Sequence, residues 1–150
     1  MAKPPITVFR ACRIVAFCGM VAYVPLAGTV AQAGEWVTVG GTHKFDRYVD
    51  MTTIGVSGHR ATLWTMRDFR VERAIPRGLY RSIRIKRQYD CHEKKSRSLH
   101  NRFYKQPMGQ GRVLYAAQAT REWSRVIPGS DDESEMKIAC RTVLASRDRR

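Results

Sequence analysis

The stretch SDDESEMKIACRTVLAS, residues 130–146, predicts the helix that closes the fold. Ser130 and Glu133 have the three-residue spacing of a capping box, which satisfies free backbone N–H groups at a helix start. Charges match the helix dipole, with Asp131, Asp132, Glu133 and Glu135 at its positive end and Arg141, Arg147, Arg149 and Arg150 at or beyond its negative end. An apolar stripe recurs at three-and-four spacing: Met136, Ala139, Cys140, Val143 and Leu144. We therefore expect Cys140 to face the element on which the helix packs, with the strand ending at Cys91 as the natural candidate.

Residues 1–33 have the three zones of a secretory signal peptide. Basic residues come first, an apolar run follows over residues 14–27, and small residues then give a cleavage site between Ala33 and Gly34. The alternative is a single membrane-spanning anchor, but a span needs roughly 20 apolar residues and this run is shorter. We expect an exported protein, located in the periplasm, at the cell surface or outside the cell. The mature chain, residues 34–150, is expected to have no transmembrane segment.

Only two cysteines remain in the mature chain, Cys91 and Cys140, because Cys12 and Cys18 leave with the signal. The sequence before Cys12 and Cys18 does not fit a lipid-anchor site, since Phe17 directly precedes Cys18. In an oxidising compartment the even count predicts a Cys91–Cys140 disulfide, with two separate buried thiols as the alternative. The chain-entropy model gives roughly 4 kcal/mol, as an upper figure, for closing a loop of about 49 residues.

The mature chain is long enough for one domain and reads as a series of strands. Strand patterns cover residues 36–39, 45–50, 60–69, 80–90, 99–105 and 113–118. Residues 119–128 are expected to form a linker in which Trp123 is a packing anchor. No helical pattern separates the strands, which favours an antiparallel sheet. The predicted fold class is therefore α+β, an antiparallel sheet of about six strands with a C-terminal α-helix packed on one face and tied by a disulfide.

The basic residues form the most distinctive chemical feature of the chain. The sequence has 27 Lys and Arg against 13 Asp and Glu, and removing Lys3, Arg10 and Arg13 with the signal leaves 24 against 13. In the strand at residues 80–90, Ile83, Ile85 and Tyr89 are expected to face inward, and Ser82, Arg84, Lys86 and Gln88 to face solvent. If the strand at residues 99–105 is its neighbour, Arg102 and Tyr104 join this exposed face. Such a surface attracts polyanions with a strong salt dependence, although a merely solubilising face is the alternative.

Residues with catalytic or metal-binding chemistry show no site pattern. The histidines are scattered without the short spacing of a zinc site: His43, His59, His92 and His100. The acidic residues at the helix start lack the alternating ligands and glycine of a calcium loop. We therefore predict a non-enzymatic protein that needs no metal and no other cofactor.

The order of several short motifs resembles the surface-adhesin protein E family of Gram-negative bacteria. These motifs are Tyr48-Val49-Asp50, Arg81-Ser82, Tyr89-Asp90-Cys91, Gly109-Gln110-Gly111, Trp123, Pro128 and Cys140. The resemblance implies a curved six-stranded antiparallel sheet and a C-terminal helix held against it by a disulfide. It also implies a homodimer as one form of the protein, and host matrix or serum glycoproteins as partners. The family's ligand contacts lie around the basic segment before the first cysteine, onto which Arg77, Arg81 and Ser82 can be laid.

The leading functional hypothesis is an exported, adhesin-like binding module of the bacterial envelope. It would recognise glycoproteins, anionic polysaccharide or anionic lipid through a basic surface formed by Arg77, Arg81, Ser82, Arg84, Lys86 and Arg102. The alternative is a periplasmic accessory or structural protein that docks a protein partner, with the basic surface incidental. A third hypothesis, binding of nucleic acid, conflicts with the export signal.

Overall fold

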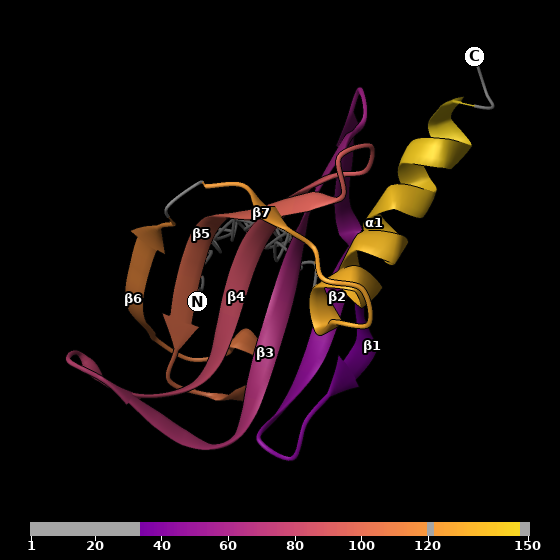
Figure 1. The fold of residues 1–150 in the computed structure, drawn as a ribbon. Helices are drawn as coiled ribbons and strands as arrows, with labels where there is room; N and C mark the ends of the chain where they lie inside the picture. The colour runs from indigo at the N-terminus through magenta and orange to yellow at the C-terminus, as the bar shows by residue number, and fades with distance from the viewer. Residues whose placement is uncertain (1–33, 120–121, 148–150) are drawn as a thin grey trace, which may run out of the picture. The chain divides into compact units, whose positions relative to one another are not determined.

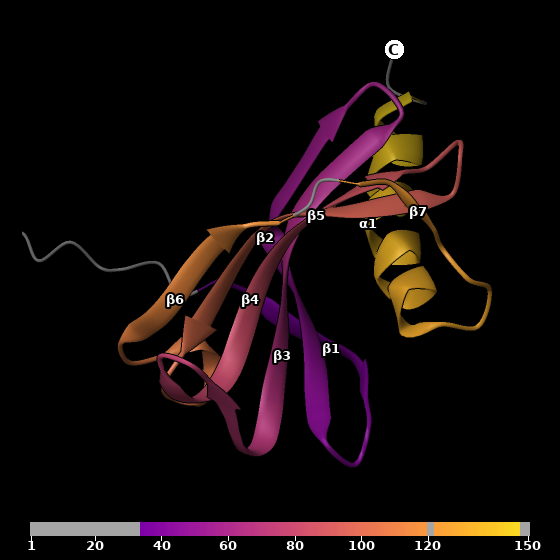
Figure 2. The ribbon, with the colours of Figure 1, turned by 60° about the vertical axis from the view of Figure 1, so that its left-hand side comes forward.

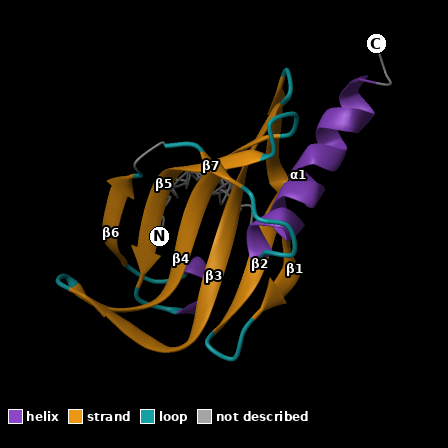
Figure 3. Ribbon diagram, in the orientation of Figure 1, coloured by secondary structure: helices purple, strands orange, loops and turns teal. Residues whose placement is uncertain are grey.

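The computed structural model describes residues 34–119 and 122–147, so the predicted signal peptide and its cleavage site at Ala33 lie outside or at the boundary of the described residues. Within them the chain forms seven strands and one α-helix (Figures 1 and 3). The strands are β1 (Trp36–Gly41), β2 (Phe45–Ser57), β3 (Arg60–Ile75), β4 (Gly78–Asp90), β5 (Lys95–Tyr104), β6 (Val113–Gln118) and β7 (Ser124–Arg125). A short 3-10 helix, η1 (Pro107–Gly109), lies between β5 and β6, and α1 (Asp131–Arg147) ends the fold.

The strands form one open antiparallel sheet, as the sequence predicts. Their order is β1-β2-β3-β4-β5-β6, and β7 pairs with the beginning of β5. Two-residue loops join β2 to β3 and β3 to β4, because Ser57 pairs with Arg60 and Ile75 pairs with Gly78. Such tight antiparallel connections keep consecutive strands adjacent.

Several strands are longer than their local patterns indicate. The register of β2 with β3 shifts between Asp50 and Gly55, and the strands then continue to the turn at Gly58. Gly55 is therefore inside the ladder and does not begin the turn. A β-bulge of this kind bends a strand without ending it, which a simple alternation pattern does not show. The expected linker before α1 also contains β7, beside Trp123.

Alternate residues of the central strands face the two sides of the sheet. One side, which we call the helix face, carries Val49, Leu63 and Tyr89, and these side chains join α1 in one core cluster. The other side, which we call the pocket face, carries Trp64, Arg84, Arg102 and further residues described below. Helix α1 contacts β1 to β4 and lies on one side of the sheet (Figure 2).

Helix α1 begins as the sequence predicts, and Met136, Ala139, Cys140 and Val143 of the predicted stripe lie in or against the core. The backbone N–H of Glu133 donates to Oγ of Ser130 over 3.3 Å, and Oε2 of Glu133 accepts from the Gly129 N–H over 2.9 Å. Ala139 and Val143 belong to the core cluster, whereas Leu144, predicted on the buried stripe, is 60 % exposed. The buried side of the helix also includes a carboxylate, Glu135, which is only 2 % exposed.

The predicted Cys91–Cys140 disulfide is confirmed. Its sulfur atoms are 2.09 Å apart and its Cα atoms 5.6 Å apart. Cys91 lies just after β4 and Cys140 in the middle of α1, so the bridge ties the helix to the turn between β4 and β5. Both cysteines pack at the border of the core cluster that contains Tyr89 and Ala139.

A second core cluster covers the part of the sheet that α1 does not reach. It consists of Phe69, Tyr80, Ile83 and Ile85, with Phe45, Ile75, Phe103 and Leu114 packed around it. Tyr80 meets both Phe69 and Phe103 edge to face, with ring centroids 5.5 Å and 5.1 Å away. Aromatic pairs in this geometry stabilise a fold by about 0.5–1.5 kcal/mol each beyond the area that they bury.

Candidate functional site

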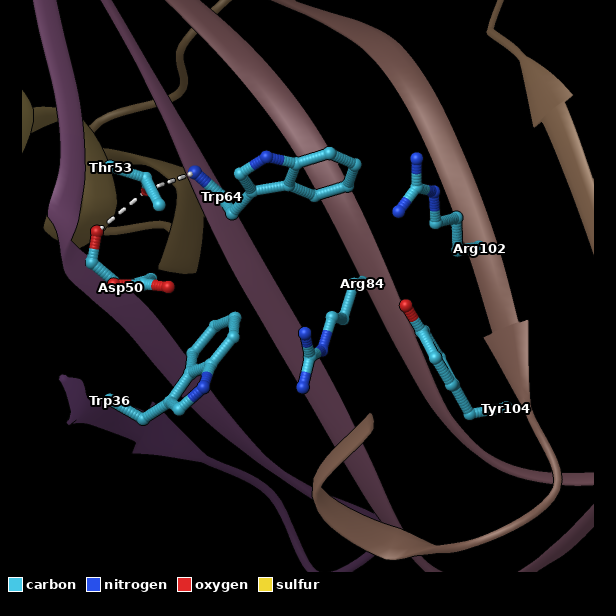
Figure 4. Close-up of a pocket in the computed structure, with 7 residues that line it drawn as sticks. All are labelled: Trp36, Asp50, Thr53, Trp64, Arg84, Arg102 and Tyr104. Atoms are coloured by element: carbon cyan, nitrogen blue, oxygen red, sulfur yellow. Dashed lines mark hydrogen bonds between the residues drawn. The ribbon is translucent and has the colours of Figure 1, made fainter. Parts of the chain in front are cut away.

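The pocket face contains a cavity of about 320 Å³ that five adjacent strands line together. Its lining residues are Trp36 of β1, Asp50 and Thr53 of β2, Trp64 of β3, Arg84 of β4, and Arg102 and Tyr104 of β5. Asp50 and Thr53 lie on one side, Arg102 and Tyr104 lie on the opposite side, and Arg84 lies between them (Figure 4). The pocket therefore combines aromatic walls with groups of both charges.

Arg84 is the central basic group of this pocket. Its guanidinium carbon lies 5.1 Å from the centre of the Trp36 ring and 5.2 Å from the centre of the Tyr104 ring. Each such cation–π contact contributes about 0.5–2 kcal/mol, the larger values applying when the pair is shielded from water. The two rings therefore hold the guanidinium in place.

The η1 turn closes one side of the Arg84 side chain. A Cβ atom on Gly109 would lie only 2.0 Å from Nε of Arg84, and the backbone of Gly109 has a φ of +66°. Glycine is therefore required here both for close approach and for backbone conformation. Nη2 of Arg84 also donates a 3.4 Å hydrogen bond to the carbonyl of Met108, whereas Nε is buried without a hydrogen-bond partner among the described residues.

Ser82 holds the η1 turn and is not available to a ligand. The alternation pattern predicts Ser82 on the solvent side, but the turn covers it and it is fully buried. Its hydroxyl donates to the carbonyl of Gln106 over 2.6 Å and accepts from the Gly109 N–H over 2.9 Å. Asp68 accepts from the Met108 N–H over 2.9 Å, and burial raises the pKa of its carboxyl although this N–H opposes the rise. These bonds fix the turn against Arg84.

Arg102 completes the basic side of the pocket. It is the direct cross-strand partner of Arg84, and its guanidinium carbon lies 5.3 Å from the centre of the Trp64 ring. Neither arginine forms an ion pair with a carboxylate in the described part of the chain. Two like charges on neighbouring strands repel each other, and a bound anion would remove that repulsion.

The acidic side of the pocket is held by local hydrogen bonds. Oδ1 of Asp50 accepts from both the backbone N–H and the hydroxyl of Thr52, over 3.1 Å and 2.6 Å. Thr53 donates to the Asp50 carbonyl over 2.8 Å and accepts from the Trp64 N–H over 3.0 Å. Figure 4 shows this chain of bonds from Asp50 through Thr53 to Trp64, which joins β2 to β3 beside the register shift.

The structure brings together only part of the predicted ligand-binding set. Arg84, Lys86 and Arg102 share the pocket face with Tyr104, because β4 and β5 are neighbours and Lys86 pairs with both Trp64 and His100. Arg84 and Lys86 are both half-buried on this face. Packing between two aromatic rings removes much of the Arg84 side chain from water.

Arg77 and Arg81 lie apart from this group. Arg77, in the loop between β3 and β4, stacks 5.3 Å from the centre of the Tyr115 ring. It lines a separate groove of about 360 Å³ with Ile75, Pro76, Phe103 and Tyr115. Nε of Arg81 donates a 3.0 Å hydrogen bond to the carbonyl of Phe69 and so supports the sheet.

Four lining residues do not appear among the sequence-based candidates: Trp36, Asp50, Thr53 and Trp64. Trp36 is the cross-strand partner of Asp50, and Asp50 is the partner of Trp64. The only signal in the sequence is that two tryptophans lie in segments with strand patterns. Their relation to Arg84 depends on the register of four strands, which local patterns do not define.

The described residues give no indication of a metal centre or a membrane span. Within residues 34–119 and 122–147, no group of three or more His, Cys, Asp or Glu side chains is arranged to hold a metal ion. None of the helices described there is long and apolar enough to cross a membrane.

Comparisons with known proteins identify the family. The family model for surface-adhesin protein E matches residues 36–141. The structure of protein E from non-typeable Haemophilus influenzae is similar, with a TM-score of 0.55 and 16% identity over 75% of this chain and 79% of that chain. A second structure of Haemophilus influenzae protein E has a TM-score of 0.53 and 15% identity over 69% of this chain and 89% of that chain. No protein with a curated description matches the chain significantly. These likenesses show a shared fold, and the family match, which spans more than half of the sequence, shows that this chain belongs to the surface-adhesin protein E family.

Proposed function

We propose that this chain is an exported, non-enzymatic binding module that recognises polyanionic ligands through its pocket face. Membership of the surface-adhesin protein E family supports the broader description, an adhesin-like protein exposed at the cell surface. The ligands would be anionic polysaccharide or the acidic glycans of glycoproteins.

The unpaired cations of the pocket face carry the proposal. Arg84, Lys86 and Arg102 lie on the adjacent strands β4 and β5, and none forms an ion pair with a carboxylate among the described residues. By contrast, Arg47 and Arg87 on the helix face bind acidic residues of α1. Unpaired charges grouped on one face produce the long-range potential that attracts a polyanion.

Elution from a heparin column tests this proposal. The variant Lys86→Glu with Arg102→Glu reverses two charges of the pocket face and leaves the stacked Arg84 untouched. The matched control is Arg125→Glu with Arg141→Glu, which makes the same change in net charge at two exposed positions on β7 and α1. We expect the pocket-face variant to elute at clearly lower salt than the control, because each Lys or Arg that contacts an anionic group of heparin adds to the salt dependence of binding.

Two results would contradict the proposal. Equal elution of the pocket-face variant and the control would show that heparin senses only net charge. If, in addition, crosslinking in cells recovered one fixed protein partner, the accessory role would replace the polyanion-binding role. Circular dichroism of each variant is needed to show that it remains folded.

Export is tested separately by cell fractionation with N-terminal sequencing. We expect a mature chain that begins at Gly34, found in the periplasm, at the cell surface or in the medium. An intact N-terminus in the cytoplasmic fraction would overturn this part of the proposal.

A further inference from the structure

We propose that the pocket lined by Trp36, Trp64, Arg84 and Arg102 binds one acidic saccharide residue, with its carboxylate or sulfate group between the two guanidinium groups. This inference rests on the proposed function and names the chemical unit that the pocket face would recognise.

The size of the pocket favours a single sugar ring. Its volume of about 320 Å³ is at the lower end of the roughly 300–1,000 Å³ typical of ligand sites. Lys86 is the cross-strand partner of Trp64, so it lies beside the pocket and outside its lining. A longer anionic glycan would place one residue in the pocket and a neighbouring acidic residue near Lys86.

The stacked arginines favour an anion and exclude a cation. Aromatic walls often bind a ligand cation, but here the protein's own cations occupy the ring faces, with Arg84 against Trp36 and Tyr104 and Arg102 against Trp64. The η1 turn further restricts Arg84, because the backbone of Gly109 lies against its guanidinium. Arginines that are already ordered lose little conformational entropy when they bind an oxyanion, which strengthens binding.

The acidic side of the pocket favours a saccharide over a free inorganic anion. Asp50 lies across the pocket from Arg102 and would repel an ion that carries only negative charge (Figure 4). Its carboxylate accepts hydrogen bonds and cannot donate them, so it suits a ligand with hydroxyl groups. An acidic sugar supplies both features, hydroxyl donors toward Asp50 and an oxyanion toward Arg84 and Arg102.

Titration with four small probes tests the inference directly. The mature chain, at low salt, is titrated with methyl glucuronide, methyl glucoside 6-sulfate, methyl glucoside and inorganic sulfate, and calorimetry measures each affinity. We expect at least one of the two acidic sugars to bind about tenfold more tightly than the neutral sugar and inorganic sulfate. A tenfold change in affinity is typical of gaining or losing one hydrogen bond to a charged group. The tighter of the two acidic sugars identifies the oxyanion as carboxylate or sulfate.

The same titration contains the results that would overturn the inference. If methyl glucoside bound as tightly as the acidic sugars, the anionic group would contribute nothing to affinity. If inorganic sulfate bound as tightly, the sugar would contribute nothing. If none of the four probes bound while heparin elution still depended on Lys86 and Arg102, the pocket would not be a saccharide site and the proposed function would stand. If an acidic sugar bound but the Lys86→Glu, Arg102→Glu variant eluted from heparin like the control, the pocket would be a saccharide site and the proposed polyanion-binding function would be wrong.

Two variants with different effects on charge show whether Arg84 is the anchor. Arg84→Gln removes the charge, and Gly109→Ala keeps every charge but adds a Cβ that would lie 2.0 Å from the present position of Nε. We expect each to weaken binding of the acidic sugar about tenfold, while Arg77→Gln, in the separate groove, has no effect. Folded Arg84→Gln and Gly109→Ala proteins with the affinity of the unmodified chain would overturn the inference.

Tryptophan fluorescence provides an independent readout of location. Of the three tryptophans, Trp36 and Trp64 line the pocket, whereas Trp123 stacks with Arg97 at a distance of 4.5 Å. We expect the acidic sugar to change the emission of the unmodified chain and of Trp123→Phe equally. A signal that survives in Trp64→Phe and disappears in Trp123→Phe would place the ligand elsewhere.

Discussion

Tyr89 of β4 donates a 2.6 Å hydrogen bond to Oε2 of Glu135 in α1, at a point where both residues are buried. The other carboxylate oxygen of Glu135 accepts from Arg47, which is 1 % exposed and comes from β2. Asp131 and Asp132 bind the same arginine, and Asp132 also binds Arg87 of β4. This network joins the first turns of the helix to two strands, beside the disulfide that holds the middle of the helix.

Glu135→Gln is expected to destabilise the protein strongly. The change removes the most buried partner of Arg47 while Asp131 and Asp132 remain, so the expected loss is below the roughly 3–5 kcal/mol that leaving a buried charge wholly unpaired costs. Urea unfolding at neutral pH measures the loss. Glu72→Gln, at an exposed position of β3, is the control and should change the free energy of unfolding by less than about 0.5 kcal/mol. A Glu135→Gln protein as stable as the control would show that the network contributes little.

The raised pKa of Tyr89 leads us to expect that the folded protein becomes less stable at alkaline pH. Burial raises the pKa of Tyr89 above its ordinary value of 10.0, and the Glu135 carboxylate raises it further. The folded protein then keeps a proton that the unfolded chain loses above about pH 10, so stability falls as the pH rises beyond that value, by about 1.4 kcal/mol per pH unit. We expect a shallower decline for Tyr89→Phe, measured by urea unfolding between about pH 9 and 11.5. Parallel curves for the two proteins would refute this assignment.

The lowered pKa of Asp90 leads us to expect that the folded protein becomes less stable at acidic pH. Its Oδ1 accepts from the backbone N–H groups of Glu93 and His92, over 2.9 Å and 3.2 Å, and Oδ2 lies 3.1 Å from Nε2 of His59. Burial opposes ionisation, but the bond from Glu93 and the contacts with His59, Arg60 and His92 together lower the pKa of Asp90. Its contribution to stability is therefore present above an ordinary aspartate pKa and lost as the pH falls below it.

Asp90→Asn is the corresponding experiment. At pH 7 we expect a loss of about 1 kcal/mol, the usual value of a hydrogen-bonding group at a turn. The difference between Asp90→Asn and the unmodified protein should shrink as the pH is lowered through about 3.9, the reference value for aspartate. If the difference in free energy of unfolding between the two proteins stayed constant down to about pH 2, the charge of Asp90 would not contribute to stability.

Cys140→Ser is expected to lower the melting temperature under non-reducing conditions. The bridge closes a loop with a sequence separation of 49, for which the chain-entropy model gives roughly 4 kcal/mol. Reductant should bring the unmodified protein close to the melting temperature of the variant and leave the variant itself unchanged. Because the Glu135 network still holds the start of α1, we expect the helix to remain on the sheet at low temperature. Complete loss of helical circular dichroism in the variant would show that the network alone is insufficient.

Local patterns in the sequence determined the elements whose cause is local. Ser130 and Glu133 define the start of α1 because the capping bonds involve only neighbouring residues. The strand pattern over Val113–Gln118 predicts β6 with the bounds that the structure has. The pairing of Cys91 with Cys140 follows from the prediction that residues 1–33 are a cleaved signal peptide, because residues 34–150 contain no other cysteine.

Only the tertiary structure decided which side chains meet. Local alternation places Arg84 and Arg102 on strand faces, but their position beside Trp36 and Trp64 depends on the register of four strand pairs. The burial of Ser82 depends on the η1 turn, which folds back from 24 residues later in the chain. Glu135 looks like a helix-start charge until Arg47 and Tyr89, far away in sequence, surround it. Contacts between distant segments arise from register and from the packing of whole elements, and the periodicity of a single segment contains neither.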